Sequence, residues 1–432
     1  MQTGNEKIGD IIERLGSALA ALTVYGSELE KPPLSSLAAL LAAAEAGDAR
    51  SAAVQDSRFT SALACCGARR VSGDLLADYI LDLVLMSDDP FAAAAAAGRM
   101  DEALFPAMRR DLAALRTLSQ LDEETLNRLV SECAEARRPD IAAKLATAAW
   151  GGAPNANHIP KERQPAPFRF ETPAPCWHYG EFGLHDAYCA DSALESMYRR
   201  FLESDDWPSL ASDLWNFHSA YGCGDFLRYR NFYLDGNGLL RPLPDLRPGD
   251  FVPLMEAEYR TLLNNTIAFL RDESAKPMLL YGAQGMGKTT LMLELTDELP
   301  QLRLVCFAPT AAGSQIISAF ETLRAQPLKF MALFDELNPS SLAGIPEPLL
   351  PMNVLVAACA AAPVLPSLFE TSVELPRMQL NEFIRVVTAL LEAEQVAMPA
   401  EAVRGACVDY QVDTRCEFSV AAAVRVKELL MS

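Results

Sequence analysis

The sequence is short of positive charge and of histidine, and both shortages narrow what the protein can do. Its 432 residues include 37 Lys and Arg against 57 Asp and Glu, so the net charge is −20. A chain this acidic repels phosphate backbones over most of its surface, which makes nucleic acid an unlikely partner. Only four histidines occur, and no Ser/His/Asp arrangement stands out, so hydrolytic acyl-transfer chemistry has little support.

Long hydrophobic runs and Cys-x-x-Cys pairs are also lacking. No apolar run reaches the ~18–20 residues that span a bilayer, and the alanine run Ala92–Ala97 is too short. The segment Met1–Leu15 has no basic leader before an apolar stretch, unlike a secretory signal. The ten cysteines form no Cys-x-x-Cys pair, and reduced cysteines in a long chain fit a cytosolic setting. We therefore expect a cytoplasmic protein without a membrane partner.

The first part of the chain is predicted to be helical. Apolar residues recur at helical spacing, beginning with Ile8, Ile11 and Leu15. Prolines and Gly/Asp/Ser clusters separate these runs. The pattern predicts an all-helical N-terminal domain over residues 1–150, made of several antiparallel helices.

The composition changes after this domain. Residues 151–245 begin with a stretch rich in Pro, Asn, Gly and Ala, typical of a linker, and continue with aromatic-rich helical patterns. The Asp-Gly-Asn-Gly run at 235–238 is a strong turn signal. It predicts a hairpin or a loop at the end of this segment.

Residues 246–379 alternate between apolar strands and helices, which predicts an α/β fold with a parallel sheet covered by helices on both faces. Residues 380–432 contain two late helical runs without a strand between them and predict a small helical subdomain. The expected strands are Pro277–Tyr281, Leu302–Phe307, Phe330–Phe334, Asn353–Cys359 and Ser372–Leu375.

A glycine-rich loop with the pattern G-x-x-x-x-G-K-[ST] follows the first of these strands and precedes a helix. Its glycines let backbone N–H groups approach phosphate oxygens, and the helix N-terminus adds the positive end of its dipole. Lys288 is expected to reach the β- and γ-phosphates of ATP, and Thr289 to bind Mg²⁺. The alternative is a glycine-rich turn that merely precedes a helix. The residues of the expected site are Gly282, Ala283, Gln284, Gly285, Met286, Gly287, Lys288, Thr289 and Thr290.

A second motif is an apolar strand that ends in two acids, Asp335 and Glu336. In phosphate-loop ATPases an acid at this place holds Mg²⁺ through water, and a following Glu polarises the attacking water. We therefore expect Asp335 to serve the metal and Glu336 to act as catalytic base. The alternative for Glu336 is a solvent-facing or helix-capping carboxylate.

A third group of residues contains the ligand types that zinc prefers. It comprises Cys176, His178, His185 and Cys189. Their spacing matches no structural zinc class that we can justify. The alternative is an ordinary aromatic, partly buried segment.

These motifs and their surroundings resemble the bacterial domain-of-unknown-function 815 family of AAA-type ATP-binding proteins. The resemblance extends from about Gly222 to the C-terminus, through Tyr221–Arg230, the phosphate loop, Lys329–Asp335 and Asn353–Val356. It implies an AAA+ P-loop core, a five-stranded parallel sheet with a helical lid. It also implies ATP and Mg²⁺ as ligands, but it supplies no substrate.

The resemblance also suggests a role for Arg415, which aligns with the arginine that begins the last lid helix. In that place it would reach the γ-phosphate, and its alternative is a surface arginine. Two departures stand out. Cys359, Ala360 and Ala361 replace a Thr-Ser-Asn run that positions the hydrolytic water, and none of them orients a water by a strong hydrogen bond. No arginine lies in Pro363–Thr371, where an arginine finger is usual.

An arginine finger contributes about 10³–10⁵ in rate, which corresponds to roughly 4–7 kcal/mol. We therefore expect a protein that binds ATP·Mg²⁺, hydrolyses ATP weakly and couples its nucleotide state to the N-terminal helical domain. The alternative is a nucleotide-binding scaffold or switch with little or no hydrolysis, and a small-molecule kinase is disfavoured. A homo-oligomer or a protein client is the candidate further partner.

Overall fold

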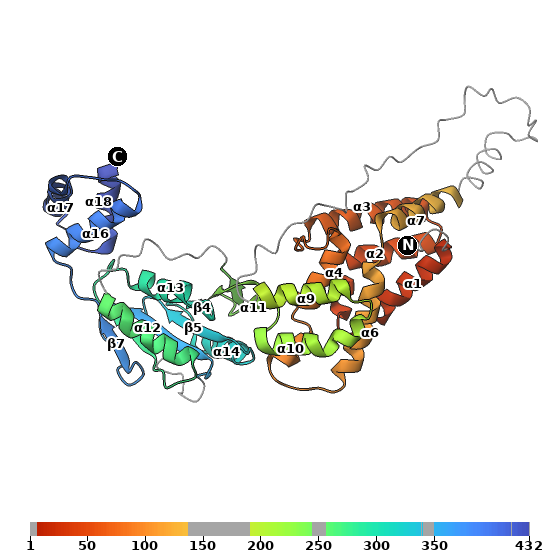
Figure 1. Ribbon diagram of the computed structural model, residues 1–432, viewed down its shortest axis with the longest axis horizontal. Coiled ribbons are helices and arrows are strands. Elements are labelled where there is room, and N and C mark those ends of the chain that lie inside the picture. The colour runs from red at the N-terminus through yellow and green to blue at the C-terminus, as the bar shows by residue number, and fades with distance from the viewer. Residues whose placement is uncertain are drawn as a thin grey trace, which may run out of the picture. The chain divides into compact units, whose positions relative to one another are not determined.

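The structure is a computed structural model of the chain and contains two compact units (Figure 1). It describes residues 7–136, 191–243, 256–337, 339, 350–415 and 417–431. The first unit extends to His218 and is called the helical unit here. The second takes most of its residues from Ser219 onwards and is called the sheet unit.

The helical unit contains only helices among its described residues, which confirms the helical prediction for this part of the chain. Two short 3-10 helices, Gly26–Glu30 and Trp207–Leu210, connect longer elements. The α-helices are α1 (Ile8–Ala21), α2 (Leu34–Glu45), α3 (Ala49–Cys65), α4 (Leu75–Met86), α5 (Pro90–Ala96), α6 (Leu104–Ser119), α7 (Glu123–Ala136), α9 (Asp191–Glu203) and α10 (Ala211–Tyr221).

Carboxylates fix the turns of this unit. Asp74 caps α4, because its Oδ1 accepts hydrogen bonds from the first-turn amides of α4 at 2.8 and 2.9 Å. Asp111 of α6 is fully buried. Its carboxylate accepts hydrogen bonds from the backbone amides of Thr23, Val24 and Tyr25 at 2.9, 2.7 and 3.1 Å. These bonds tie the turn after α1 to α6 and give the buried carboxylate hydrogen-bond donors.

Aromatic side chains join α9 and α10 to the helical unit. The ring of Trp215 on α10 packs edge-to-face on Phe91 of α5, with centroids 5.2 Å apart. The hydroxyl of Tyr198 on α9 donates a hydrogen bond to the buried carboxylate of Asp82 on α4. Both helices were expected in a separate segment over residues 151–245. The structure differs from that division, because aromatic contacts place them in the first unit.

A seven-stranded sheet forms the centre of the sheet unit, in the order β2-β1-β4-β5-β6-β3-β7. The strands are β1 (Asn231–Leu234), β2 (Leu240–Pro242), β3 (Met278–Tyr281), β4 (Leu302–Phe307), β5 (Lys329–Phe334), β6 (Val354–Ala360) and β7 (Thr371–Glu374). Strands β3 to β7 coincide with the five predicted apolar runs, and they pair in parallel. The predicted five-stranded parallel sheet is therefore confirmed and is part of a larger one.

A hairpin extends this sheet at one edge. Oδ1 of Asp235 accepts hydrogen bonds from the amides of Asn237 and Leu239, both at 2.9 Å, and holds the predicted turn between β1 and β2. Strand β1 pairs in parallel with β4, and β2 pairs with β1 in antiparallel fashion. The α/β core was expected to begin after residue 245. The two strands of the hairpin lie before that residue, yet they belong to the same sheet because β1 pairs with β4.

Helices cover both faces of the sheet (Figure 1). The helices of the sheet unit are α11 (Asp225–Arg228), α12 (Glu256–Leu270), α13 (Lys288–Glu298), α14 (Gly313–Arg324), α16 (Leu380–Ala393), α17 (Ala400–Thr414) and α18 (Val420–Met431). Successive residues of β4 alternate between two cores, since Leu304 belongs to one and Val305 to the other. Helices α12 and α13 supply Leu262 and Leu291 to the first core, and α14 supplies Phe320 to the second.

The last three helices form the small helical subdomain that the sequence predicted, here called the lid. Phe383 of α16 lies against Phe418, with ring centroids 4.7 Å apart. Phe383, Val403 and Val426 are buried in the same hydrophobic cluster as Val373 of β7, so the lid continues one core of the sheet. No helix in the described part of the chain is long and apolar enough to cross a membrane.

Candidate functional site

The predicted phosphate loop connects β3 to α13, as its motif requires. Its glycines Gly282, Gly285 and Gly287 have φ angles of 150°, 76° and 85°. Larger residues rarely adopt such angles. A Cβ atom on Gly282 would also lie 2.7 Å from the carbonyl oxygen of Leu375. Glycine at these positions therefore follows from backbone conformation and, at Gly282, from a close approach to the chain after β7.

The loop directs backbone donors toward a common space at the start of α13. Gly287 is the N-cap of α13, and the helix begins at Lys288. The first amides of a helix lack intrahelical acceptors and carry the positive end of its dipole, so an anion binds there favourably. Gln284 is exposed, whereas Met286 is buried in the core. Met286 therefore contributes its backbone to such a site, while its side chain anchors the loop.

The ammonium of Lys288 lies over its own loop. Its Nζ donates hydrogen bonds to the carbonyl oxygens of Gly282 and Ala283 at 3.0 and 2.9 Å. The side chain is half-buried. The loop thus holds a positive charge beside the first turn of α13, where a phosphate group would need it.

The two residues expected to serve a metal ion lie together. The hydroxyl Oγ1 of Thr289, in the first turn of α13, lies 2.9 Å from both carboxylate oxygens of Asp335. Asp335 directly follows β5, and Thr290 follows Thr289 in the same helical turn. Both partners are half-buried. A hydroxyl and a carboxylate in contact are the hard oxygen ligands that Mg²⁺ prefers.

The charge of Asp335 affects the pKa of two cysteine thiols on the strands beside β5. Burial, and secondly the Asp335 carboxylate, raises the pKa of Cys306 on β4 to about 11. The same two causes raise the pKa of Cys359 on β6 well above its usual value, and Lys288 opposes them. Both thiols therefore stay protonated at neutral pH. They pack at the hydrophobic base of the site, as expected for cysteines in apolar strands.

Glu336 turns away from the strand. Its φ angle is +48°, in the left-handed region, and its side chain is exposed. Its amide donates a hydrogen bond to Oδ1 of Asp335 at 3.1 Å, and the next amide, of Leu337, donates to the carbonyl of Cys359 at 2.9 Å. Non-glycine residues with such a φ are strained and cluster at functional sites. The carboxylate is thus solvent-facing beside Asp335.

The lid meets the phosphate loop through α18, and not through Arg415. Arg415 is exposed at the C-terminal end of α17, with a φ angle of +50°. The last lid helix begins at Val420, so the expectation that Arg415 begins it is wrong, because α17 extends to Thr414. The amide of Ala421 donates a hydrogen bond to the carbonyl of Gly285 at 3.0 Å.

Small residues make this contact. A Cβ on Gly285 would lie 3.1 Å from Cβ of Ala421 and 3.3 Å from Oγ of Ser419. Oγ of Ser419 also accepts a hydrogen bond from the amide of Ala422 at 3.2 Å, so it caps α18. Sequence reasoning missed Ser419 and Ala421, since nothing in a Ser-Val-Ala run indicates contact with a loop more than 130 residues earlier.

Two other features singled out in the sequence are Ala361 and a group of cysteines and histidines. Ala361 follows β6 directly and is exposed. The cysteine and histidine group lies outside the described residues; its members are Cys176, His178, His185 and Cys189. Within the described ranges, no group of three or more His, Cys, Asp or Glu side chains is placed to hold a metal ion.

Comparison with solved structures finds distant likenesses at low sequence identity. The Holliday junction branch migration motor RuvB of Thermotoga maritima has 15% identity and a TM-score of 0.29, over 41% of this chain and 69% of that one. Cdc6p of Pyrobaculum aerophilum has 15% identity and a TM-score of 0.34, over 44% and 63%. The Aeropyrum pernix Orc1 protein in complex with DNA has 19% identity and a TM-score of 0.27, over 44% and 68%.

The sequence comparisons are more specific. No curated protein matches the chain. Residues 227–341 match the model of a family described as a protein of unknown function, DUF815. This stretch contains the phosphate loop, Asp335 and the strands from β1 to β5. The strand β3 that leads into the phosphate loop lies between β6 and β7 in the sheet. Over residues 227–341 the chain is therefore similar to the domain-of-unknown-function 815 family.

Proposed function

We propose that this protein binds ATP together with Mg²⁺ at the phosphate loop, and hydrolyses it slowly. The observation that carries the proposal is the contact of Thr289 with both carboxylate oxygens of Asp335 at 2.9 Å, beside the ammonium of Lys288. A hydroxyl from a helix and an acid from a neighbouring strand converge there with a positive charge. Phosphate-loop ATPases require this combination for a magnesium-bound triphosphate.

The roles of the residues follow from this geometry. The amides from Gly285 to Thr289 would surround the β-phosphate, since the glycines expose them. Lys288 would exchange its two loop carbonyls for phosphate oxygens, which offer it stronger, charge-assisted hydrogen bonds. Thr289 and Asp335 would hold Mg²⁺, and Thr290 would extend the phosphate contacts.

Slow turnover is proposed because the groups that speed hydrolysis are weak or missing. Glu336 is exposed beside Asp335 and is the candidate base. Ala361 offers a methyl group where a polar side chain would position water. The connection Pro363–Thr371 contains no arginine. The second candidate function, a nucleotide-dependent switch without hydrolysis, is favoured by Ala361.

Nucleotide state would be communicated through the lid. The first turn of α18 is bonded to the carbonyl of Gly285, inside the loop that would bind phosphate. A change in loop conformation at Gly285 would therefore alter its hydrogen bond with Ala421. Coupling to the helical unit, binding of a protein client and assembly of several copies remain predictions, and so does the absence of nucleic acid among the partners. One distant structural likeness, the Orc1 protein, is in complex with DNA.

Binding is tested with Lys288→Ala in a thermal unfolding experiment with ATP and Mg²⁺. A ligand at 100 times its Kd stabilises a protein by about 2.7 kcal/mol. We expect that gain in the wild type and its loss in Lys288→Ala, because the loop contains no other lysine. Lys31→Ala is the matched control, since Lys31 makes only an exposed pair with Glu28. A wild-type response to ATP in Lys288→Ala contradicts the loop assignment.

Hydrolysis is tested by single-turnover phosphate release from the wild type and from Glu336→Gln. We expect a slow wild-type rate and a drop of about 10²–10⁴-fold in the variant if Glu336 acts as base. Glu273→Gln, at an exposed position after α12, is the matched control. Equal, near-background rates for all three proteins would rule out hydrolysis and leave the switch as the function.

A further inference from the structure

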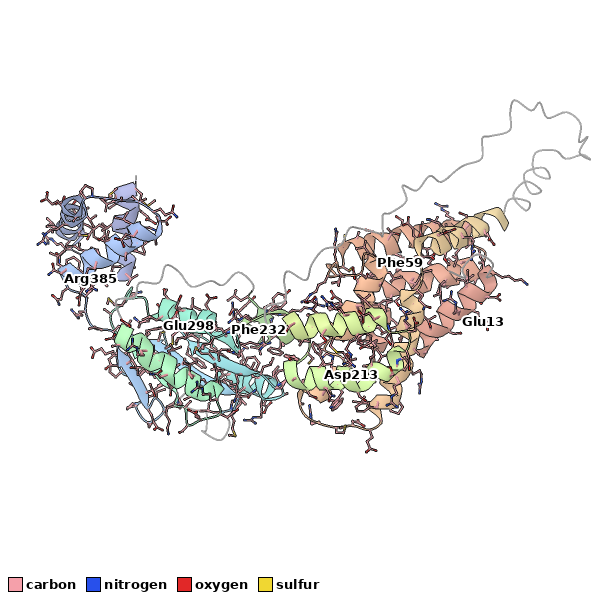
Figure 2. The ribbon with its side chains drawn as sticks, in the orientation of Figure 1. Glu13, Phe59, Asp213, Phe232, Glu298 and Arg385 are labelled. Atoms are coloured by element: carbon pink, nitrogen blue, oxygen red, sulfur yellow. The ribbon has the colours of Figure 1, made fainter. Side chains whose placement is uncertain are left out.

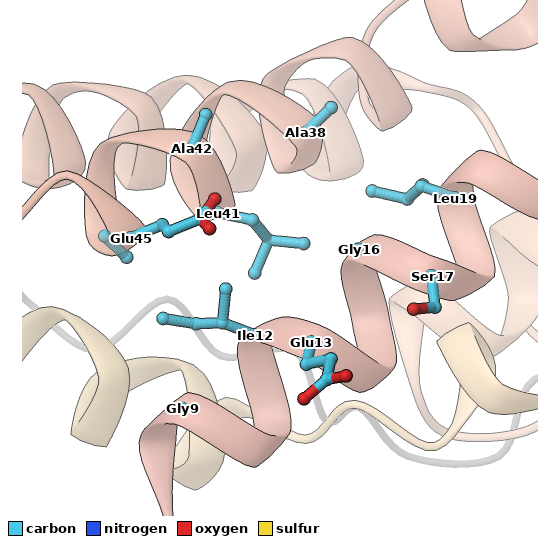
Figure 3. A pocket seen from close by; sticks show the side chains of 11 residues that line it. Gly9, Ile12, Glu13, Gly16, Ser17, Leu19, Ala38, Leu41, Ala42 and Glu45 are labelled. Atoms are coloured by element: carbon cyan, nitrogen blue, oxygen red, sulfur yellow. The ribbon is translucent and has the colours of Figure 1, made fainter.

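A groove with a volume of about 810 Å³ lies on the helical unit between α1 and α2 (Figure 3). Ile12, Leu19 and Leu41 point into the space between the two helices (Figure 3). Leu19 and Leu41 are buried, and Ile12 is half-buried, so the floor of the groove is apolar. This volume lies in the range of sites that bind a ligand or part of a peptide.

Small residues form the sides of the groove. Gly9 and Gly16 stand two turns apart on one face of α1, and Ala38 and Ala42 stand one turn apart on α2. A Cβ on either glycine would meet no atom within 4 Å. Glycine inside a helix costs roughly 0.5–1 kcal/mol relative to alanine. The packing of the helical unit does not require these two glycines, and their effect is to let another backbone come close.

The charged residues of the groove are all acidic. Glu13 of α1 and Glu45 of α2 line it, and both are exposed. Among the described residues that line the groove, none is basic. A ligand with positive charges beside an apolar surface would complement this site. A second copy of the chain fits poorly, because two molecules of net charge −20 repel each other.

We propose that this groove binds an amphipathic helix of a partner protein, with Lys or Arg on both sides of its apolar stripe. Gly9 and Gly16 are seven positions apart on α1, so this part of the groove is about 10 Å long at a rise of ~1.5 Å per residue. Two to three turns of a partner helix would fill it, with apolar anchors spaced as i, i+3 or i+4, and i+7. Lys or Arg on its flanks would reach Glu13 and Glu45.

The probe is a fluorescein-labelled synthetic peptide of Leu, Ala and Lys, three helical turns long, with Leu at that spacing and Lys on both flanks. Its control carries Glu in place of every Lys. We expect fluorescence anisotropy to show binding of the lysine peptide to the full chain, at least about tenfold tighter than the glutamate peptide. If neither peptide binds, or both bind equally, the proposal is overturned.

Charge reversal locates the binding. The double variant Glu13→Lys/Glu45→Lys is expected to lose the preference for the lysine peptide and to favour the glutamate peptide. The matched control is Glu102→Lys/Glu203→Lys, at exposed positions outside the groove lining, which changes the net charge equally. If both double variants weaken binding equally, the attraction belongs to the whole acidic surface, and the groove is excluded.

Filling the groove provides a test that does not depend on charge. Gly16→Leu places a side chain in open space and removes a helix glycine, so we expect the fold to be retained or stabilised. Peptide affinity should fall at least about tenfold. Unchanged affinity overturns the proposal. So does a wild-type dimer that becomes a monomer in Gly16→Leu, because the occupant would then be a second copy.

Discussion

An aspartate in each unit differs from the other in its burial and in the number of hydrogen bonds that its carboxylate accepts. Asp111, in the helical unit, is fully buried, and three backbone amides and a threonine hydroxyl donate hydrogen bonds to it. Asp335, in the sheet unit, is half-buried and accepts hydrogen bonds from the hydroxyl of Thr289 and from one amide. Figure 2 shows the two units with their side chains.

The difference separates an acid whose acceptor sites are filled by the fold from the acid that we propose to bind a ligand. A carboxylate has about four acceptor sites, and at Asp111 they are occupied by groups that fold the chain. At Asp335 the hydroxyl of Thr289 and one backbone amide are neutral partners. Burial alone therefore does not distinguish the two acids. They differ in the number and kind of hydrogen-bond donors that contact the carboxylate.

The comparison is tested most strongly by Asp111→Ala. The substitution leaves buried amides at Val24 and Tyr25 without acceptors, and each such group costs about 1–3 kcal/mol. We expect the helical unit to lose roughly 3–5 kcal/mol of stability, as when one partner of a buried charge network is removed. Urea unfolding followed by tryptophan fluorescence measures this loss, because all four tryptophans precede His218.

Asp10→Ala is the control for this prediction. Asp10 is exposed in the first turn of α1, so its loss should cost only about 0.3–1 kcal/mol through the helix dipole. If Asp111→Ala is as mild as Asp10→Ala, the hydrogen bonds to Asp111 contribute little, and the distinction between the two kinds of acid fails.

Asp335→Ala should have the smaller effect on stability. It removes the hydrogen bond from the Thr289 hydroxyl, worth about 0.5–1.5 kcal/mol, and the one from the amide of exposed Glu336, which water can replace. It also relieves the charge of the carboxylate. We expect unfolding of the sheet unit, followed by circular dichroism without nucleotide, to change by less than about 1 kcal/mol. Titration with ATP should show that Mg²⁺ no longer strengthens binding. Strong destabilisation without nucleotide would instead mark Asp335 as structural.

The sequence predicted the sheet and the position of the phosphate loop between a strand and a helix, because their signals are local. The five strands are short apolar runs, and the phosphate loop is a continuous motif in which Gly282, Lys288 and Thr289 have fixed spacing. The helices of the first unit also show their period directly. In each case the physical cause, strand burial or loop geometry, acts on neighbouring residues of the chain.

The features that sequence reasoning missed depend on contacts between distant segments. Trp215 belongs to the helical unit because it packs on Phe91, more than 120 residues earlier. Ala421 contacts Gly285 although neither residue type indicates it. The expected place of Arg415 failed because α17 continues to Thr414. A small side chain such as that of alanine allows two backbones to approach closely. No sequence motif marks an alanine that has this role.

The hairpin at the sheet edge also bears on solubility. Strand β2 is three residues long and ends at Pro242, which has no N–H to offer another strand. Its middle residue, Arg241, is charged and lies beside the carboxylate of Asp235 at 3.1 Å. A short edge strand with a proline and a charge is a poor template for strand addition. At this edge the sheet is protected from pairing with other chains, so aggregation by β-strand stacking is disfavoured there.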